Sequence, residues 1–294
     1  MMQIARDTGS CATWQALGLT PGLVLRLSGM RRSGNHAIAN WLMRNAPTGT
    51  SVFLNNCKPN RDPLHHFSAL EVNRHHVAGG DAAGDLPSRV AKAGDGALLL
   101  ISYEDTSPAE MKRHRRLSGP LDEAAIDHDI LIYRSFLNWS ASLLKKLQGN
   151  PSYSLSRRLS MVLRAMDNYT RLLALVARGQ GAETCICYDT WVQSDSYRQD
   201  ILVRLNLPVA DTDVGEVQKY GGGSSFQKQS ASGDELRVLD RWHQMQTEPD
   251  YQLVLAAACR DAALMAQLDR LFPEDAERLT QIARHAPVSP GDLT

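Results

Sequence analysis

The chain has 294 residues, of which 43% are hydrophobic and 22% charged, and its 32 basic side chains are balanced by 32 acidic ones. This length suits one α/β domain with insertions, and the apolar fraction supports a sizeable core. The neutral net charge argues against a general nucleic-acid coat or a polybasic membrane anchor, so any anion site must come from a local cluster of basic residues.

Five scattered cysteines without a C-x-x-C pair indicate neither a zinc ribbon nor a disulfide framework, and they favour reduced thiols in a cytoplasm. The segment Met1–Leu19 lacks the apolar core of a secretory signal, and no apolar run approaches the length of a membrane span. We therefore expect a cytoplasmic protein without a transmembrane segment. Residues 1–18 and 286–294 are expected to be loose ends.

Short apolar runs predict five strands. In chain order the expected strands are Leu23–Ser28, Ser51–Leu54, Ala97–Tyr103, Asp129–Tyr133 and Thr184–Tyr188. Helical spacing of apolar residues predicts helices between them. These cover Asn35–Arg44, a segment that opens at Ser107 and Pro108, Phe136–Leu147, Leu155–Ala177, Tyr197–Leu205, Asp234–Gln244 and Tyr251–Leu271. The segment Asn55–Asp95 has no clear period and is interpreted as an irregular excursion with room for one helix.

The expected strands are continuous apolar runs and not alternating ones, so both faces of the sheet should be covered. The sequence therefore predicts an α/β fold over residues 1–294, a single domain with a central, mostly parallel five-stranded sheet flanked by helices. Ligands of such sheets bind beyond the carboxyl ends of the strands. The residues that follow each strand are therefore the candidates for function.

The stretch Gly29–His36 (GMRRSGNH) lies between the first expected strand and the first expected helix. Its two glycines, five residues apart, let backbone N–H groups converge on an anion, and the helix N-terminus adds to that field. The spacing matches the nucleoside-triphosphate loop G-x-x-x-x-G-K-[ST], but Asn35 and His36 stand where that motif needs Lys and Ser or Thr. ATP or GTP binding is therefore disfavoured. Two adjacent arginines argue against a turn without a ligand.

The same loop resembles the 5′-phosphosulfate loop of the sulfotransferase family, which reads basic-Ser-Gly-Thr-Thr after the first strand. Arg32 replaces the usual lysine, and Asn35 and His36 replace the two threonines. The resemblance implies a fold of the P-loop nucleotide-hydrolase-like, sulfotransferase type. It also implies that 3′-phosphoadenosine-5′-phosphosulfate is the donor and adenosine 3′,5′-bisphosphate the product. The loop residues that would bind the donor are Arg31, Arg32, Ser33, Gly34, Asn35 and His36.

Three later motifs extend the resemblance over residues 23–230. The family binds the donor's 3′-phosphate with an arginine at the end of the fourth strand and a serine eight residues later, and Arg134 and Ser142 have that spacing. Tyr188 follows the fifth strand, where the family often has an aromatic residue near adenine; ordinary packing is an equal alternative. A late basic loop that closes over the 3′-phosphate, or a flexible linker, would comprise Lys219, Gly221, Gly222 and Gly223.

The resemblance implies in-line transfer of a sulfuryl group, in which the protein positions the reactants and stabilises charge on the leaving oxygen. Arg32 is expected to face that oxygen. In the family the base that takes the acceptor's proton follows the third strand, which here ends in Glu104 and Asp105. Glu104 is the first candidate and Asp105 the second. The structural alternative for either is a helix cap or an ion pair with an arginine. No metal is expected.

The acceptor stays open: a small molecule, a glycan or a lipid. His65, His66, His75 and His76 lie where the family lines its acceptor pocket, but they match no standard metal spacing. The basic run Lys112–Arg116 is either a solvated helix face or a landing site for an anionic acceptor. No nucleic-acid partner is expected, and the oligomeric state is open. The alternative functions are a P-loop kinase or triphosphatase, and a non-catalytic nucleotide-binding module of the same fold.

Overall fold

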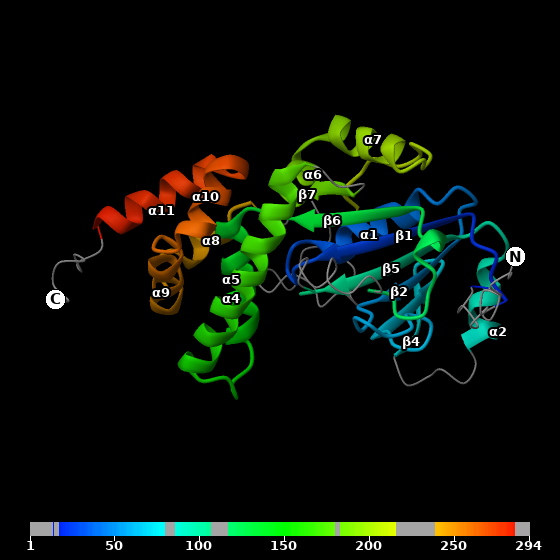
Figure 1. Ribbon diagram of the computed structural model, residues 1–294, viewed down its shortest axis with the longest axis horizontal. Coiled ribbons are helices and arrows are strands. Elements are labelled where there is room, and N and C mark those ends of the chain that lie inside the picture. Colours follow the sequence, from blue (N-terminus) through cyan, green and yellow to red (C-terminus); the bar gives the residue numbers. More distant parts are fainter. Residues whose placement is uncertain are drawn as a thin grey trace, which may run out of the picture.

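Seven strands form one sheet within the residues that the computed structural model describes, which are 14, 18–79, 86–106, 117–179, 183–215 and 239–285. The order across the sheet is β4-β3-β2-β5-β1-β6-β7. The strands are β1 (Leu23–Gly29), β2 (Ser51–Asn55), β3 (Ala69–Val72), β4 (His75–Gly79), β5 (Leu98–Glu104), β6 (His128–Tyr133) and β7 (Thr184–Cys187). Figure 1 shows this sheet with helices on both sides.

The five expected strands are β1, β2, β5, β6 and β7, and they run parallel to one another. This confirms the predicted α/β fold with a mostly parallel central sheet. The predicted strand count was too low, because the segment interpreted as an irregular excursion contains β3 and β4, which add to the edge in antiparallel fashion. Asn73 and Arg74 join them, with φ of 50° and 66°. Two consecutive residues with positive φ make the tight hairpin turn.

The described helices are α1 (Asn35–Arg44), α2 (Leu86–Val90), α4 (Phe136–Gln148), α5 (Leu155–Arg178), α6 (Tyr188–Gln193), α7 (Asp195–Arg204), α8 (Arg241–Met245), α9 (Pro249–Ala258), α10 (Ala262–Leu271) and α11 (Pro273–His285). Two single 3₁₀ turns are η3 (Ala91–Ala93) and η4 (Glu123–Ala125). The expected segment Tyr251–Leu271 is divided into α9 and α10, because Asp261 caps a new helix by accepting the Leu264 N–H at 3.0 Å. The helix expected after Ser107 lies outside the described residues.

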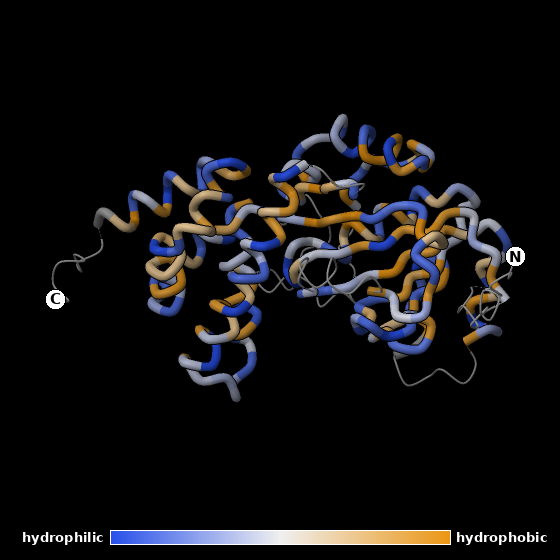
Figure 2. The backbone as a smooth tube through the Cα atoms, in the orientation of Figure 1, coloured by the Kyte–Doolittle hydropathy of each residue, from blue (hydrophilic) through white to orange (hydrophobic). Residues whose placement is uncertain are grey.

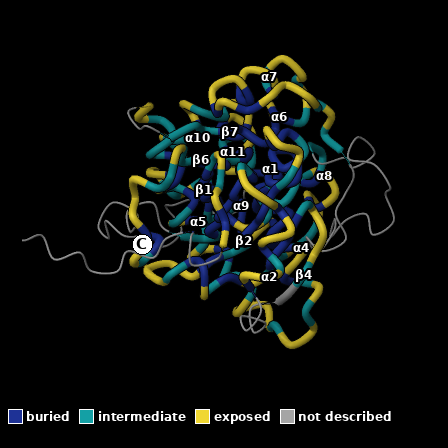
Figure 3. The backbone as a smooth tube through the Cα atoms, turned by 90° about the vertical axis from the view of Figure 1, so that its right-hand side faces the viewer, coloured by how far each residue is buried: buried dark blue, intermediate teal, exposed yellow. Residues whose placement is uncertain are grey.

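Hydrophobic side chains of the sheet pack on both faces. Figure 2, in which the backbone is coloured by hydropathy, shows hydrophobic residues along the strands. Leu25 and Leu27 of β1 point toward α1, α6 and α7 and pack with Trp41 and Trp191. Val24, on the opposite face, belongs to a second core with α2. A third core joins β6 to α4, α5 and the C-terminal helices. Buried positions accordingly concentrate in the middle of the molecule and exposed positions on its outside (Figure 3).

The strand order reverses at β1, which lies between β5 and β6. In the plane of the sheet, β5 and β2 lie to one side of β1, and β6 and β7 lie to the other. In such sheets ligands bind beyond the carboxyl ends at this reversal. The segments that follow β1, β5, β6 and β7 therefore meet at one edge. Within the described ranges, no helix has both the length and the apolar character needed to cross a bilayer.

Candidate anion-binding site

Two glycines in the loop after β1 stand where a side chain would meet close neighbours. Gly34 has φ of 92°, and a Cβ there would collide with the ring of Tyr188. A Cβ on Gly29 would lie 2.6 Å from Asn35 Oδ1 and 3.0 Å from the Ile132 carbonyl oxygen. No side chain caps the start of α1 at Gly34. The helix N-terminus is thus available to an anion, as the sequence pattern predicts.

Arg31 is held by Asp105 at the end of β5. The Arg31 backbone N–H donates to Asp105 Oδ1 at 2.8 Å, and the Arg31 guanidinium forms an ion pair with the same carboxylate. Trp139 Nε1 donates to the Arg31 carbonyl at 3.0 Å. The Arg31 side chain is 49% exposed and so lies at the rim of the site. Asp105 therefore fixes the loop through its ion pair with Arg31. An ion pair with an arginine is the structural alternative that the sequence left open for this residue.

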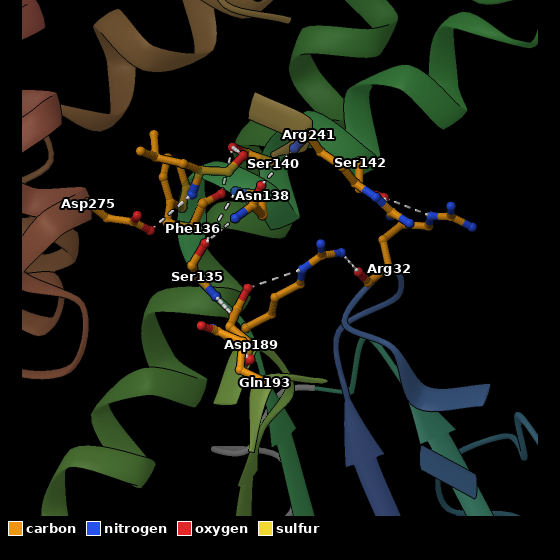
Figure 4. Close-up of polar contacts among 12 residues, drawn as sticks. Arg32, Ser135, Phe136, Asn138, Ser140, Ser142, Asp189, Gln193, Arg241 and Asp275 are labelled. Carbon is orange, nitrogen blue, oxygen red and sulfur yellow. Dashed lines mark hydrogen bonds and ion pairs between the residues drawn. The ribbon is translucent and has the colours of Figure 1, made fainter. Parts of the chain in front are cut away.

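Ser142 joins the loop to two other parts of the chain. Its hydroxyl, fully buried in α4, accepts a hydrogen bond from Arg32 Nε at 3.3 Å and another from Arg241 Nη1 at 2.7 Å. Arg134, at the end of β6, donates from Nη1 to the Arg32 carbonyl at 3.2 Å. Figure 4 shows Arg32 and Arg241 reaching Ser142 from opposite sides. Two guanidinium groups therefore meet at one hydroxyl, and that of Arg134 holds the backbone of the same loop.

This cluster, called here the arginine cluster, consists of Arg32, Arg134 and Arg241. Burial, together with the positive charges of Arg134 and Arg32, lowers the pKa of Arg241 to about 9, against the opposing effects of Tyr188 and Asp189. Burial and the charge of Arg134 also lower the pKa of Arg32. Because desolvation and like charges disfavour the charged form, an anion placed among these groups would relieve both penalties.

Asp189 lies at the back of the arginine cluster. Its Oδ1 is 3.8 Å from Arg134 Nε, and its Oδ2 accepts the Ser135 N–H at 2.6 Å. Tyr169 donates its hydroxyl hydrogen to the Arg134 carbonyl at 2.5 Å. Arg134 is 1% exposed, so its position is set from several sides by buried partners. The guanidinium is therefore preorganised, which is what tight recognition of a phosphate requires.

Glu104 lies beside the loop and not in the arginine cluster. Asn35 Nδ2 donates to Glu104 Oε1 at 3.1 Å and to the Met30 carbonyl at 3.2 Å. The pKa of His36 is lowered, first by burial and also by Arg32, against the raising effect of Glu104, so the imidazole is neutral at pH 7. Within the described residues the buried Ser33 hydroxyl has no hydrogen-bond partner. The loop thus carries polar groups that its own fold does not use.

Tyr188 packs under the loop. Its ring contacts Gly34, stacks on Trp191 at 5.7 Å between centroids, and lies 5.0 Å below the Arg134 guanidinium. Tyr188 therefore has a packing role at the end of β7. The same ring also supports Arg134 through a cation–π contact.

The remaining candidates either lie outside the described residues or lie away from this site. Lys219, Gly221, Gly222, Gly223 and the run Lys112–Arg116 lie outside the described residues. His75 and His76 belong to β4, at the far edge of the sheet from β1. His65 Nε2 lies 3.9 Å from Asp62 Oδ2. Among the described residues no group of three or more His, Cys, Asp and Glu side chains could hold a metal.

The sequence analysis missed Arg241. It begins the short helix α8, which follows no strand, and no motif marks it. Its backbone N–H donates to Asn138 Oδ1 at 3.0 Å, so α8 is docked against α4 next to Ser142. A search restricted to the ends of strands cannot find such a residue, because its place depends on packing between distant helices.

No family model and no curated relative matches the chain. Two solved structures are similar to it at low identity. Mouse sulfotransferase SULT7A1 complexed with PAP is 10% identical with a TM-score of 0.42, over 92% of this chain and 95% of that one. The sulfotransferase domain of the Synechococcus PCC 7002 olefin synthase is 14% identical with a TM-score of 0.43, over 92% and 97%. Both likenesses are distant.

Proposed function

We propose that the protein is a sulfotransferase that transfers a sulfuryl group from 3′-phosphoadenosine-5′-phosphosulfate to a hydroxyl or amine. The observation that carries this proposal is the meeting of Arg32 and Arg241 at Ser142, with Arg134 bonded to the Arg32 carbonyl of the glycine loop. This arrangement offers two anion-binding points a short distance apart. The donor carries two anionic groups on one nucleoside, so it matches the arrangement.

Each anionic group has its own set of partners in this proposal. The 5′-phosphosulfate lies against the backbone of Arg31–His36 and the N-terminus of α1, with Arg32 beside it. The 3′-phosphate lies against Arg134, Ser142 and Arg241. Arg32 touches Ser142 and so connects the two points. Four predicted contributors to the donor site, Lys219, Gly221, Gly222 and Gly223, stay predictions.

ATP and GTP fit this site less well. A P-loop that binds a triphosphate with Mg²⁺ needs Lys and Ser or Thr after the second glycine. Asn35 occupies the lysine position, and its amide nitrogen is already engaged by Met30 and Glu104. An asparagine amide cannot offset the charge of a γ-phosphate. The kinase or triphosphatase alternative therefore lacks the groups on which its chemistry depends.

Glu104 is the proposed general base. It takes the proton of the acceptor's hydroxyl or amine, the acceptor atom forms a bond to sulfur, and the bond from sulfur to the bridging phosphate oxygen breaks. Negative charge develops on that oxygen, where Arg32 and the loop N–H groups stabilise it. Asn35 orients the Glu104 carboxylate from the side of the loop. Asp105 is the weaker candidate, because Arg31 already occupies its carboxylate.

A thermal-shift panel tests the proposal. The ligands are adenosine 3′,5′-bisphosphate, ATP and GTP, each with and without Mg²⁺. A ligand that binds the folded state raises the melting temperature by mass action. We expect the bisphosphate to give the largest increase and to need no metal. A larger, Mg²⁺-dependent increase with ATP or GTP would support the P-loop alternative and contradict the sulfotransferase.

A further inference from the structure

Helix α5 carries four arginines at a constant spacing. Arg157, Arg164, Arg171 and Arg178 follow one another at intervals of seven residues, and Asp167 is the single acidic residue of this 24-residue helix. All four arginines are exposed. The whole chain has no net charge, so this row is a local accumulation of positive charge. These four residues are called the α5 stripe below.

The α5 stripe lies on the side of the helix that faces away from the core. Seven residues fall only about 20° short of two full turns, so the arginines stay on one side and are about 10.5 Å apart along the axis. The buried residues of α5 are Val162, Met166, Tyr169, Leu172 and Leu173, on the opposite side. The α5 stripe is therefore a straight row, about 30 Å long, that points to solvent.

Partners among the described residues leave most of this charge unopposed. Arg157 lies 4.6 Å above the ring of Tyr153, and Arg164 donates to Ser160 Oγ at 3.1 Å. Arg171 pairs with Asp167 at 2.6 Å, and both side chains are more than half exposed, at 51% and 60%. An exposed pair of this kind holds its partners weakly. Among the described contacts, the Asp167 carboxylate is thus the one acidic partner of the four guanidinium groups.

The middle of the α5 stripe adjoins the candidate site. Asn168 Nδ2 donates to the carbonyl oxygen of Asp105 at 3.5 Å. Asn168 lies four residues after Arg164 and three before Arg171, and such pairs are neighbours on a helix surface. The half-exposed Arg31, paired with Asp105, continues the positive charge to the loop. A ligand lying along the stripe would therefore pass the rim of the site next to Glu104.

The length of the stripe selects the kind of ligand. A small molecule cannot contact a row about 30 Å long, so a ligand that engages the whole row is an anionic polymer. The exposed side of α5 lacks the aromatic platform that single-stranded nucleic acids stack on. A membrane would need an apolar face, and that of α5 is buried in the core.

We propose that the α5 stripe binds an acidic polysaccharide, and that this class of chain is the acceptor. Such a chain combines spaced carboxylates, which the arginines recognise, with the hydroxyl groups that a sulfuryl acceptor must supply. The claim that this polysaccharide is the acceptor rests on the proposed sulfotransferase function. The claim that the α5 stripe binds it does not. The stripe holds the chain, and the rim at Arg31 and Asn168 guides one sugar toward Glu104.

The test compares three proteins that differ in charge placement. They are the wild type, a stripe variant (R157Q, R164Q, R171Q, R178Q) and a control variant that removes four exposed arginines elsewhere (R61Q, R204Q, R260Q, R278Q). The probes are polygalacturonate, neutral dextran, a thymidine oligonucleotide and phosphatidylserine vesicles. Dissociation constants are measured at several salt concentrations. Adenosine 3′,5′-bisphosphate affinity is measured on the same samples.

We expect the wild type and the control variant to bind polygalacturonate with a steep salt dependence, and the stripe variant to bind it at least roughly tenfold more weakly. With labelled donor, the stripe variant should show a raised KM for polygalacturonate and an unchanged kcat. Equal losses in both variants, or tighter binding of the oligonucleotide or the vesicles, would overturn the proposal. Failure of all three proteins to bind the bisphosphate would instead contradict the sulfotransferase function and leave polysaccharide binding standing.

Discussion

Arg241 Nη1 donates a hydrogen bond of 2.7 Å to Ser142 Oγ, although 99 residues separate the two along the chain. The same oxygen accepts from Arg32 Nε, so one hydroxyl holds guanidinium groups from the first loop and from a C-terminal helix. The candidate anion site therefore includes a residue from α8, a helix that does not follow a strand. Its affinity should depend on Arg241 as strongly as on the residues that the sequence pattern marks.

Arg134→Ala should weaken binding of adenosine 3′,5′-bisphosphate by about 1.5–3 kcal/mol, the range for a hydrogen bond to a charged group. The guanidinium is buried and fixed by Asp189 and the loop, so its loss is not offset by rearrangement. Isothermal titration calorimetry measures the change. Exposed Arg204 provides the matched control, and Arg204→Ala should leave the affinity unaltered. Unchanged affinity in a folded Arg134→Ala protein would remove this residue from the site.

Arg241→Met should lower the affinity for the bisphosphate but not for adenosine 5′-phosphate, which lacks the 3′-phosphate. Methionine keeps much of the apolar stem while removing the charge and the bond to Ser142. Competition binding with the two nucleotides separates the positions. An equal loss for both ligands would mean that Arg241 serves the 5′ side or the fold, and not the 3′-phosphate.

Glu104→Gln should leave bisphosphate affinity nearly intact and lower turnover by about two to four orders of magnitude, the usual contribution of a positioned base. Glutamine keeps the size and the contact with Asn35 but cannot take the proton. Transfer of labelled sulfate, once an acceptor has been found by screening, reports the rate. Wild-type turnover in this variant would show that Glu104 is not the base.

Asp105→Asn is the companion variant. Asp105 accepts from the Arg31 N–H and pairs with its guanidinium, so its loss should loosen the loop. We expect a lower melting temperature and weaker bisphosphate binding, with a smaller effect on turnover at saturating donor than Glu104→Gln. If Asp105→Asn instead abolishes turnover with donor affinity unchanged, the roles of the two carboxylates are exchanged.

Asp275 predicts a pH dependence of stability. Burial, followed by the charge of Asp189, raises its pKa to about 7, against the hydrogen bond from the Leu137 N–H. A carboxyl whose folded pKa is raised contributes stability that is fully present below its unfolded pKa, near 4, and is lost as the pH rises through about 7. Unfolding free energy should therefore fall between pH 4 and pH 7 by an amount on the order of a few kcal/mol.

Asp275→Asn isolates this effect, because asparagine still accepts from Leu137 and carries no charge. Denaturant titrations at pH 5 and pH 8 should show that the variant loses less stability than the wild type over this interval. Glu277→Gln, at an exposed position of the same helix, is the control. Parallel pH profiles for the wild type and Asp275→Asn would mean that the carboxyl titrates in its ordinary range.

Local sequence patterns were sufficient to predict the parallel strands and the first loop. The runs around Leu25 and Leu100 are apolar on both faces, and Gly34 needs its positive φ within the loop itself. The hairpin of β3 and β4 was missed because its strands are only four and five residues long, and the turn at Asn73 is its main local signal. Arg241 depends on the docking of α8 against Asn138, a contact that no local pattern encodes. The ion pair of Asp105 was foreseen only as an alternative, because its partner lies 74 residues away.

The central claim is that the glycine loop and the arginine cluster together bind a nucleoside with anionic groups at both its 5′ and its 3′ positions. Calorimetry in buffer without divalent cations tests it most directly, by comparing adenosine 3′,5′-bisphosphate with adenosine 5′-phosphate on the wild type and on Arg134→Ala. The account predicts that the bisphosphate binds the wild type at least about tenfold more tightly, since hydrogen bonds to charged groups contribute about 1.5–3 kcal/mol. Arg134→Ala should remove most of this preference. Equal affinity of the wild type for the two nucleotides would contradict the claim.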